Sequence, residues 1–482
     1  MRNNFFQLLE VALDIRKQFS HSLSSEEWGE IMDMAHKQAL VGILFEGINK
    51  LPKEQWPPKP FVFKWTLAAE NIKRRNMLTT DVCLRLTNEL EKNGFDACIL
   101  KGQGNHTYYA GLTDNPSLGL LRTCGDIDAW VWPKKPTKHP VKSIIDFCQE
   151  KHILVSLCHL HAEVKPIDGV PIEIHFRPSF LNAPWRDRAF QKIFRKAQFV
   201  KANIDGCGEI QKMRVDYDLI FQLNHIYRHL LDEGVGLRQV LDFYVLLKDY
   251  HRQAAASQGN VLMSKAELMQ KIRACGMSRF ASALMYVLQE IFAMKEEYLI
   301  CPASEKHGKF LLSEMMLAGN FGHYDERMVQ LEVKKGKLSY QLRKAQRRFK
   351  RNLRFLTSYP EEVICEPMAR VAHWIWRKYR LWLRNKSVNL QQEKCNLIIG
   401  DAIMNTISVD SNIYRGAELY AKLHNVSIGQ MVEKYLLRFQ VPTSRKLPSL
   451  TLPAHLEKLG GCLAGIEDEN DEKLDYLLEK YK

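Results

Sequence analysis

The sequence predicts an α+β protein in which a small α/β core lies between two helical regions. Apolar residues recur at helical spacing from residue 4 to residue 93 and again from residue 215 to about residue 332. Between these regions, short apolar runs bounded by glycine and aspartate are typical of strands and turns. With 46% hydrophobic and 26% charged residues, the 482-residue chain can bury a sizeable core, and roughly two to four domains are expected.

The N-terminal region, residues 1–95, is expected to consist of helices. Helical spacing of apolar residues predicts them at residues 4–19, 26–48 and 61–93. Ser24 and Ser25 precede the second helix as N-cap residues. Prolines between residues 52 and 60 break the pattern before the third helix, and Gly94 ends it.

The α/β core is expected over residues 96–205. Apolar runs predict strands at residues 96–100, 126–132, 160–164 and 171–176, and residues 142–151 have the pattern of a helix. Asp168-Gly169 favours the tight turn of a hairpin, so the last two strands are expected to pair. Residues 206–332 are then predicted to form a helical domain.

Three carboxylates in this core suggest a metal site. Because strand residues two apart point to the same face, Asp126 and Asp128 are expected to lie side by side. Adjacent carboxylates repel one another unless a cation neutralises them, and Mg²⁺ (or Mn²⁺) accepts such oxygen ligands together with substrate phosphates. On the later strand, Glu173 and His175 share the face that is turned away from the core. Three carboxylates on neighbouring strands suit metal-assisted nucleotidyl transfer from an NTP, in which one carboxylate can accept the proton of the attacking hydroxyl.

Phosphate contacts are expected from residues that precede the Asp pair. Lys101 and Gly102 end the first strand, and a glycine turn into a helix presents free backbone N–H groups to phosphate. Arg122 can offer a bidentate contact, and Gly125 lets the backbone approach a ligand closely. An isolated Asp-x-Asp is more often a solvated turn or a cap, so the prediction depends on the combination of these elements.

This combination resembles a known family. Leu100-Lys-Gly102, Arg122-Thr-Cys-Gly-Asp-Ile-Asp128 and Ile172-Glu-Ile-His175 are similar to motifs of the uncharacterised bacterial nucleotidyltransferase family in the polymerase-β-like superfamily. The resemblance covers roughly residues 1–385 and implies a small mixed-sheet core of the polymerase-β-like type. It also implies that Asp126, Asp128 and Glu173 form the catalytic metal site, and that Lys101, Gly102 and Arg122 lie at the nucleotide.

A second group of residues lies in the helical domain. His225, the run Gly236-Leu-Arg238 and Asp242 resemble the downstream helical region of the same family, so His225, Arg238 and Asp242 are substrate-side candidates together with His175. His225 and His229 have zinc-compatible spacing, but packing or a substrate-side hydrogen bond is favoured because no acidic residue stands between them as in H-E-x-x-H. Arg238 and Asp242, also four residues apart, are expected to pair, with a role near the active site as the alternative.

A basic, aromatic-rich helical segment is expected at residues 333–390. Residues 334–386 contain sixteen Lys or Arg against three Glu, which is nearly the whole net charge of +14. Three interpretations stay open: a solvated amphipathic helix, a surface for RNA or another polyanion, and a membrane-surface helix.

Membrane insertion and secretion are not expected. No apolar run approaches the ~20 residues of a membrane span, and no signal peptide is recognised. Eleven scattered cysteines without a CxxC pair fit free thiols in a reducing compartment, so a cytoplasmic location is expected.

The C-terminal residues are expected to form a separate module at 402–440, followed by an acidic tail at 441–482. Residues 404–410 alternate apolar and polar residues like a short strand, and two helices follow, the second opened by a capping box from Ser427 to Gln430. So small a unit cannot bury its own core and is expected to dimerise through its strand. Residues 404–482 resemble ribbon–helix–helix antitoxins, which implies DNA binding or a toxin partner, and a plain dimerisation appendage is the alternative.

Two functions stay open from the sequence. The first is a metal-dependent nucleotidyltransferase that transfers a nucleoside monophosphate from an NTP to a hydroxyl on RNA, a protein or a small molecule, with the C-terminal module dimerising or restraining it. The alternative is a non-catalytic, antitoxin-like regulator that binds DNA or a toxin and carries an idle nucleotidyltransferase domain.

Overall fold

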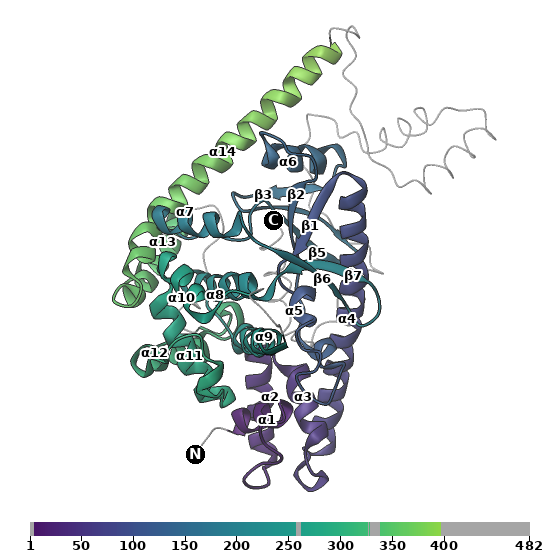
Figure 1. Ribbon diagram of the computed structural model, residues 1–482, viewed down its shortest axis with the longest axis vertical. Coiled ribbons are helices and arrows are strands. Elements are labelled where there is room, and N and C mark those ends of the chain that lie inside the picture. The colour runs from purple at the N-terminus through teal and green to yellow at the C-terminus, as the bar shows by residue number, and fades with distance from the viewer. Residues whose placement is uncertain (1–3, 257–261, 326, 328–337, 397–482) are drawn as a thin grey trace, which may run out of the picture. The chain divides into compact units, whose positions relative to one another are not determined.

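The computed structural model describes residues 4–256, 262–325, 327 and 338–396 (Figure 1). The chain divides into two compact units, residues 1–390 and residues 391–482, and the site lies in the first. As the sequence predicts, the first unit has an α+β fold in which a small sheet is embedded among helices. The module expected at residues 402–440 and the tail at residues 441–482 lie outside the described residues.

The N-terminal helices follow the predicted order but not all of the predicted bounds. They are α1 (Asn4–Ala12), α2 (Ser25–Lys37), α3 (Val41–Lys50), the 3₁₀ turn η1 (Lys53–Gln55) and α4 (Lys59–Lys92). The first helix was expected to run to residue 19 but ends at Ala12. Ser24 is confirmed as an N-cap, because its side chain accepts the Glu27 N–H while the Glu27 side chain accepts the Ser24 N–H.

The single helix expected at residues 26–48 is wrong, since the chain breaks between α2 and α3. Ala39 adopts a left-handed φ of 54°, and the Leu40 N–H bonds back to the Ala35 carbonyl at 2.9 Å. This resembles a helix C-terminus closed by a left-handed residue, which is usually glycine. Alanine at this position gave no sequence signal for the break.

Helix α4 joins the N-terminal helices to the sheet (Figure 1). Its first half buries Trp65 and Ala69 in the core formed with α1 to α3. Its second half buries Val82, Leu86 and Leu90 against the strands. The long helix expected at residues 61–93 is therefore confirmed.

The core sheet is mixed and has the strand order β1-β2-β5-β4-β3. Strands β2 and β5 are parallel, and the other neighbouring pairs are antiparallel. The turn between β4 and β5 holds Asp168 at φ 50° and Gly169 at φ 69°, as a type I′ hairpin turn requires, so the predicted hairpin is confirmed. The strands are β1 (Phe95–Ile99), β2 (Ile127–Pro133), β3 (Leu154–Leu157), β4 (His161–Ile167) and β5 (Val170–His175).

The two faces of this sheet differ in chemistry. Ile127, Ala129, Ile172 and Ile174 are buried in one apolar cluster with α4 and with α6 (Pro140–Glu150). Because strand side chains alternate, the residues between them project from the opposite face. That face carries the polar residues of the candidate site.

Several elements surround the sheet without having been predicted. They are the short helix α5 (Gln103–His106), the 3₁₀ turn η2 (Leu118–Leu121), helix α7 (Pro184–Phe194), and a separate hairpin of β6 (Phe199–Asn203) and β7 (Glu209–Met213), in addition to β3.

The helical region is confirmed from Val215 to Gly322, whereas the first residues of the range expected at 206–332 contain strand β7; this region shares a hydrophobic core with α1 to α3. Leu8 and Trp28 of the N-terminal helices are buried in the same cluster as Phe243 and Phe292. The elements are α8 (Val215–Asp232), α9 (Leu237–Ala256), α10 (Lys265–Ala274), α11 (Ser278–Phe292), η3 (Glu296–Tyr298), α12 (Glu305–Ala318) and η4 (Asn320–Gly322).

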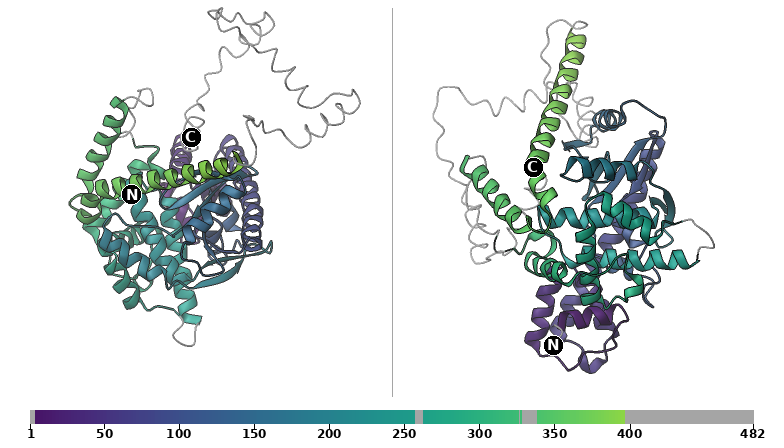
Figure 2. Two further views of the ribbon diagram at one scale, coloured as in Figure 1. Left: turned by 90° about the horizontal axis from the view of Figure 1, so that it is seen from above. Right: turned by 60° about the vertical axis from the view of Figure 1, so that its left-hand side comes forward.

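The basic segment consists of α13 (Leu338–Phe355) and α14 (Pro360–Asn396), which Figure 2 shows as two helical rods joined by a short turn. Phe355 and Tyr359 at the junction are buried in the main core. Among the described residues, no helix combines the length and the apolar composition that crossing a bilayer requires.

Candidate functional site

Strand register brings the predicted carboxylates together. Asp128 in β2 is directly opposite Glu173 in β5, and Glu173 is in turn opposite Glu163 in β4. Directly opposite residues project from the same face of a sheet, so all three carboxylates line one surface. Asp126 immediately precedes β2 and lies two residues before Asp128.

The carboxylates of Asp126, Asp128 and Glu173 form a compact group. One oxygen from each lies within 4.8 Å of the others. The Asp128 side chain is 1% exposed, whereas that of Glu173 is 18% exposed and Asp126 is also partly accessible. The cluster therefore has a buried base and an open rim.

Two cationic side chains contact Asp128. Lys101 Nζ lies 2.9 Å from Oδ2, and His175 Nε2 lies 3.0 Å from Oδ1 and 3.3 Å from Glu173 Oε2. Burial would raise the pKa of Asp128, but the charges of Lys101 and His175 outweigh it and hold the pKa below the usual carboxyl range. Glu173 behaves alike: burial opposes ionisation, but His175 and His161 lower its pKa. Both carboxylates are therefore ionised at neutral pH.

The donor set fits a divalent cation. Three carboxylates within 4.8 Å, of which Asp128 and Glu173 are ionised, form an anionic oxygen environment that suits Mg²⁺ or Mn²⁺. Lys101 and His175 already neutralise part of this charge, so a cation would share the Asp128 oxygens with them.

The turn after β1 runs close to the loop that carries Asp126. Gly102 has a left-handed φ of 54°, and a Cβ built on it would lie 3.4 Å from the Asp126 carbonyl oxygen. A side chain would thus be strained by its conformation and would touch the carboxylate loop. At Gly125, by contrast, a Cβ would meet no atom within 4 Å, so there the backbone borders open space.

Arg122 lies in the interior rather than at the open rim. Its Nε and Nη2 each donate to Asp242 at 2.7 Å, and Tyr109 donates its hydroxyl to the same carboxylate at 2.8 Å. Arg122 and Asp242 are both 4% exposed. The pair connects the loop before β2 to α9, and a phosphate contact by Arg122 would require this pair to open.

Arg238 lies on the same side of α9 as Asp242 but does not pair with it as expected. Its Nη1 donates to the Thr123 carbonyl at 2.8 Å, and its buried Nε lacks a hydrogen-bond partner among the described residues. Burial and the charge of Arg122 lower the pKa of Arg238, while Asp242 and Asp126 raise it. Arg238 therefore lies close to the loop that carries Asp126, whose negative charge raises the pKa of the Arg238 guanidinium group.

His225 is partly buried on α8. Its ring packs edge-on against His229 at 4.3 Å between centroids and stacks on Phe221 at 6.0 Å. Burial lowers the pKa of His225 well below its ordinary value, and the charge of Lys101 adds to this effect. His225 is accordingly neutral, and its contacts are those of a packed side chain.

His161 on β4 was missed by the sequence interpretation. Its Nδ1 lies 3.2 Å from Glu173 Oε2, and its Nε2 lies 3.9 Å from Glu163 Oε1. Burial would lower the pKa of His161, but Cys158, Glu163 and Glu173 raise it to about 11. The sequence did contain a signal, because hairpin alternation places His161 and Glu163 on the same face as Glu173 and His175.

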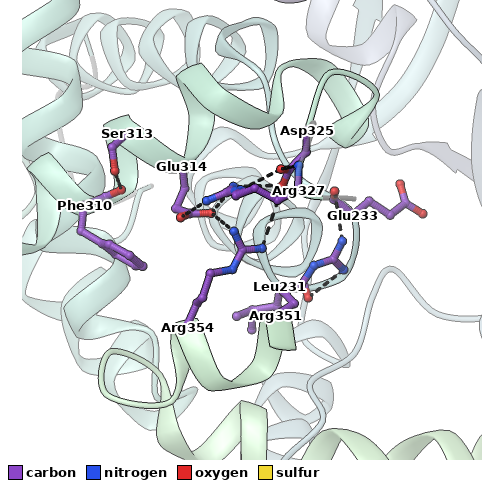
Figure 3. A network of polar contacts seen from close by, with 9 residues as sticks. All are labelled: Leu231, Glu233, Phe310, Ser313, Glu314, Asp325, Arg327, Arg351 and Arg354. Carbon is purple, nitrogen blue, oxygen red and sulfur yellow. Dashed lines mark hydrogen bonds and ion pairs between the residues drawn. The ribbon is translucent and has the colours of Figure 1, made fainter. Parts of the chain in front are cut away.

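The arginines of α13 that could form a basic surface are partly used inside the protein (Figure 3). Arg351 donates to the carbonyls of Leu231 and Glu233 at 3.3 Å, and Arg354 lies 3.4 Å from Glu314. On the outer side of the same helix, Phe349 is 63% exposed. A polyanion would therefore have to rely on other cations of the segment, such as the exposed Lys350, Arg377 and Lys378.

Comparison with known proteins gives two family matches. A family model described as an uncharacterised nucleotidyltransferase matches residues 24–293, more than half of the chain. A family of unknown function matches residues 405–481, which neither supports nor excludes the ribbon–helix–helix resemblance. No curated protein and no solved structure matches the chain.

Proposed function

The chain belongs to the family described as uncharacterised nucleotidyltransferases, and we propose that it transfers a nucleoside monophosphate from an NTP to a hydroxyl acceptor in a reaction that needs Mg²⁺ or Mn²⁺. The observation that carries this proposal is the meeting of Asp126, Asp128 and Glu173 within 4.8 Å on one face of the sheet. Family membership supports the reaction class, and the donor set supports the cation.

The three carboxylates divide between two tasks in this proposal. Asp126 and Asp128 hold the cation, which when bound neutralises triphosphate charge and polarises the α-phosphorus. The acceptor oxygen bonds to that phosphorus, the bond to the β-phosphate oxygen breaks, and pyrophosphate leaves. Glu173, ionised and on the accessible rim, serves as a third ligand or accepts the hydroxyl proton.

Cations around the carboxylates would bind the triphosphate. Lys101 is 21% exposed beside Asp128 and can turn its ammonium group to a phosphate oxygen. The backbone at Gly102 and Gly125 allows close approach. Arg238 is the better placed of the two arginines, because its Nε is unpartnered among the described residues while Arg122 is held by Asp242. We assign Arg122 and Asp242 a positioning role.

Label transfer tests the proposal. The full chain is incubated with Mg²⁺ and each of the four α-labelled NTPs in turn, with total RNA, protein extract or a small-molecule extract as acceptor. We expect label in one acceptor pool, abolished by EDTA and by the Asp126→Asn/Asp128→Asn double variant. The matched control is Asp168→Asn in the exposed β4–β5 turn, which should keep full activity.

The outcomes of this assay distinguish a nucleotidyltransferase from a non-catalytic regulator, the two functions that the sequence leaves open. Label that survives the double variant, or no transfer from any NTP to any pool even after residues 404–482 are removed, would refute the enzyme. The surviving alternative would then be a regulator that binds DNA or a toxin.

A regulatory role is proposed for the C-terminal residues. We propose that residues 404–482 dimerise or restrain the enzyme, on the basis of their strand–helix–helix sequence pattern. Removing them should change either the number of chains per particle, measured by sedimentation, or the rate of label transfer. No change in either would contradict this role.

The RNA pool of the same assay tests the polyanion role of residues 334–386.

A further inference from the structure

Two histidines adjoin the carboxylate cluster and are not used by the proposed reaction. His161 and His175 are directly opposite one another on β4 and β5, and both contact Glu173. One ligand atom each from His161, Glu173 and His175 lies within 4.8 Å of the others. Their side chains are 17%, 18% and 5% exposed, so the group is largely shielded from solvent.

The distances from the histidine nitrogens to the Glu173 oxygen match those between the ligand atoms of a small tetrahedral ion. Zn²⁺ binds imidazole nitrogen and carboxylate oxygen at about 2.0–2.1 Å, so two ligand atoms of a tetrahedron lie roughly 3.3 Å apart. His161 Nδ1 is 3.2 Å and His175 Nε2 is 3.3 Å from Glu173 Oε2. Asp128 Oδ1, 3.0 Å from His175 Nε2, is available as a fourth corner. Two of the three separations among His161, Glu173 and His175 therefore already suit such an ion, and the whole group lies within 4.8 Å.

The surroundings of His161 also resemble support for a metal ligand. Ligating histidines usually direct their second ring nitrogen to a carboxylate, which fixes the ring. His161 Nε2 faces Glu163 Oε1 at 3.9 Å, and Glu163 Oε2 accepts the Ser156 hydroxyl at 2.9 Å. Glu163 therefore offers the ring a carboxylate on the side opposite to Glu173, at a distance longer than a hydrogen bond.

From this geometry we propose that His161, Glu173 and His175 form a binding site for a borderline transition-metal ion of the Zn²⁺ class, beside the oxygen site of Asp126 and Asp128 and sharing Glu173 with it. Imidazole ligands favour Zn²⁺ and Co²⁺ over Mg²⁺ and Mn²⁺, which prefer oxygen. The proposal does not require nucleotidyl transfer, because ion binding is measured without NTP. The competing explanation is that the two rings are cations that merely neutralise the carboxylates.

Cobalt titration of the full chain tests the site. The protein is stripped with a chelator, and Co²⁺ is added while the visible absorption is followed. We expect about one equivalent to produce the intense bands of a four-coordinate site, which Zn²⁺ abolishes and excess Mg²⁺ does not. No such bands, or bands removed by Mg²⁺, would overturn the proposal.

Variants locate the ion. His161→Gln should abolish the bands, and Glu163→Gln should weaken Co²⁺ binding by roughly 10- to 100-fold because it removes only the support of His161. His159→Gln is the matched control, since this histidine stacks on His373 outside the group, and it should bind as the wild type does. Asp126→Asn should keep the bands.

The variant results decide between this site and its neighbour. Unchanged bands in His161→Gln, or bands lost in Asp126→Asn but not in Glu163→Gln, would refute the proposal. Circular dichroism confirms that each variant is folded, and Glu163→Gln serves as the test if His161→Gln is not. Cobalt binding without label transfer would leave this site standing while the proposed reaction fails.

Discussion

The buried pair of Arg122 and Asp242 offers a sharp test of how the loop before β2 is held. Asp242→Asn keeps the size of the side chain but removes the charge that faces the guanidinium group. Arg122 donates two 2.7 Å hydrogen bonds to Asp242, and both residues are 4% exposed, so water cannot replace the lost carboxylate. The variant leaves a buried positive charge without its counterion.

The size of the effect follows from this burial. Breaking a buried ion pair by removing one partner costs about 3–5 kcal/mol, whereas an exposed pair contributes about 0.5 kcal/mol or less. With an m-value of about 3 kcal/mol/M, the urea midpoint should fall by roughly 1 M or more. Asp146→Asn is the matched control, because it breaks an exposed pair with Lys142 and should shift the midpoint by less than about 0.2 M.

A double-mutant cycle completes the test by urea unfolding followed with circular dichroism. Arg122→Met alone should also destabilise the protein, because it leaves the buried Asp242 carboxylate beside Tyr109 without the arginine that neutralises it. The double variant Arg122→Met/Asp242→Asn should lose clearly less than the sum of the two single variants, because neither buried charge remains. Additive losses, or an Asp242→Asn midpoint equal to that of the control, would refute the role assigned to this pair.

Four further variants test His161, Lys101 and two glycines. In the metal-free protein, the raised pKa of His161 means that protonation of this ring stabilises the folded state fully below pH about 6.5, and this stability is lost as the pH rises toward about 11. His161→Gln should therefore flatten the loss of stability between these two pH values in urea unfolding of the metal-free protein, and an unchanged slope would contradict this expectation. Lys101→Met should lower kcat/KM for label transfer by roughly 10- to 100-fold through loss of a charged phosphate contact, whereas an unchanged value would remove Lys101 from the nucleotide site. Gly42→Ala should destabilise the protein by about 1–3 kcal/mol because its Cβ would lie 2.1 Å from the Leu121 carbonyl oxygen. Gly29→Ala, whose Cβ meets nothing within 4 Å, should instead stabilise the protein by up to about 1 kcal/mol. Urea unfolding measures both glycine variants.

Much of the fold could be predicted where local pattern and tertiary structure agree. Helix α4 has a long apolar period, a proline in its first turn and Gly94 after its end. The β4–β5 hairpin has Asp168-Gly169, which tolerates the two left-handed residues that its turn needs. In both cases the local signal and the final contacts favour the same structure.

Prediction failed where the decisive interaction is nonlocal or the usual residue is missing. The break at Ala39 lacks the glycine that normally marks a left-handed helix end. Strand β3 is only four residues long and its pairing with β4 contains an irregularity, so its alternation is weak. These elements are specified by packing that a single sequence does not display.

The candidate site shows the same division. The carboxylates Asp126, Asp128 and Glu173 could be chosen from strand alternation together with the neighbouring motifs, and the register brings them together. The partner of Arg122 could not, because Asp242 is 120 residues away along the chain. His161 could have been found by extending the alternation of the hairpin to its first strand.

The central claim is that the group transferred is the nucleoside monophosphate and that Asp128 is needed for its transfer. Paired reactions with the same NTP, labelled at either the α- or the γ-phosphate, test this most directly in wild type, Asp128→Asn and the control Asp168→Asn. We predict that α-label joins the acceptor, that γ-label leaves as pyrophosphate, and that Asp128→Asn alone stops both. Transfer of γ-label to the acceptor, or full activity in Asp128→Asn, would contradict it.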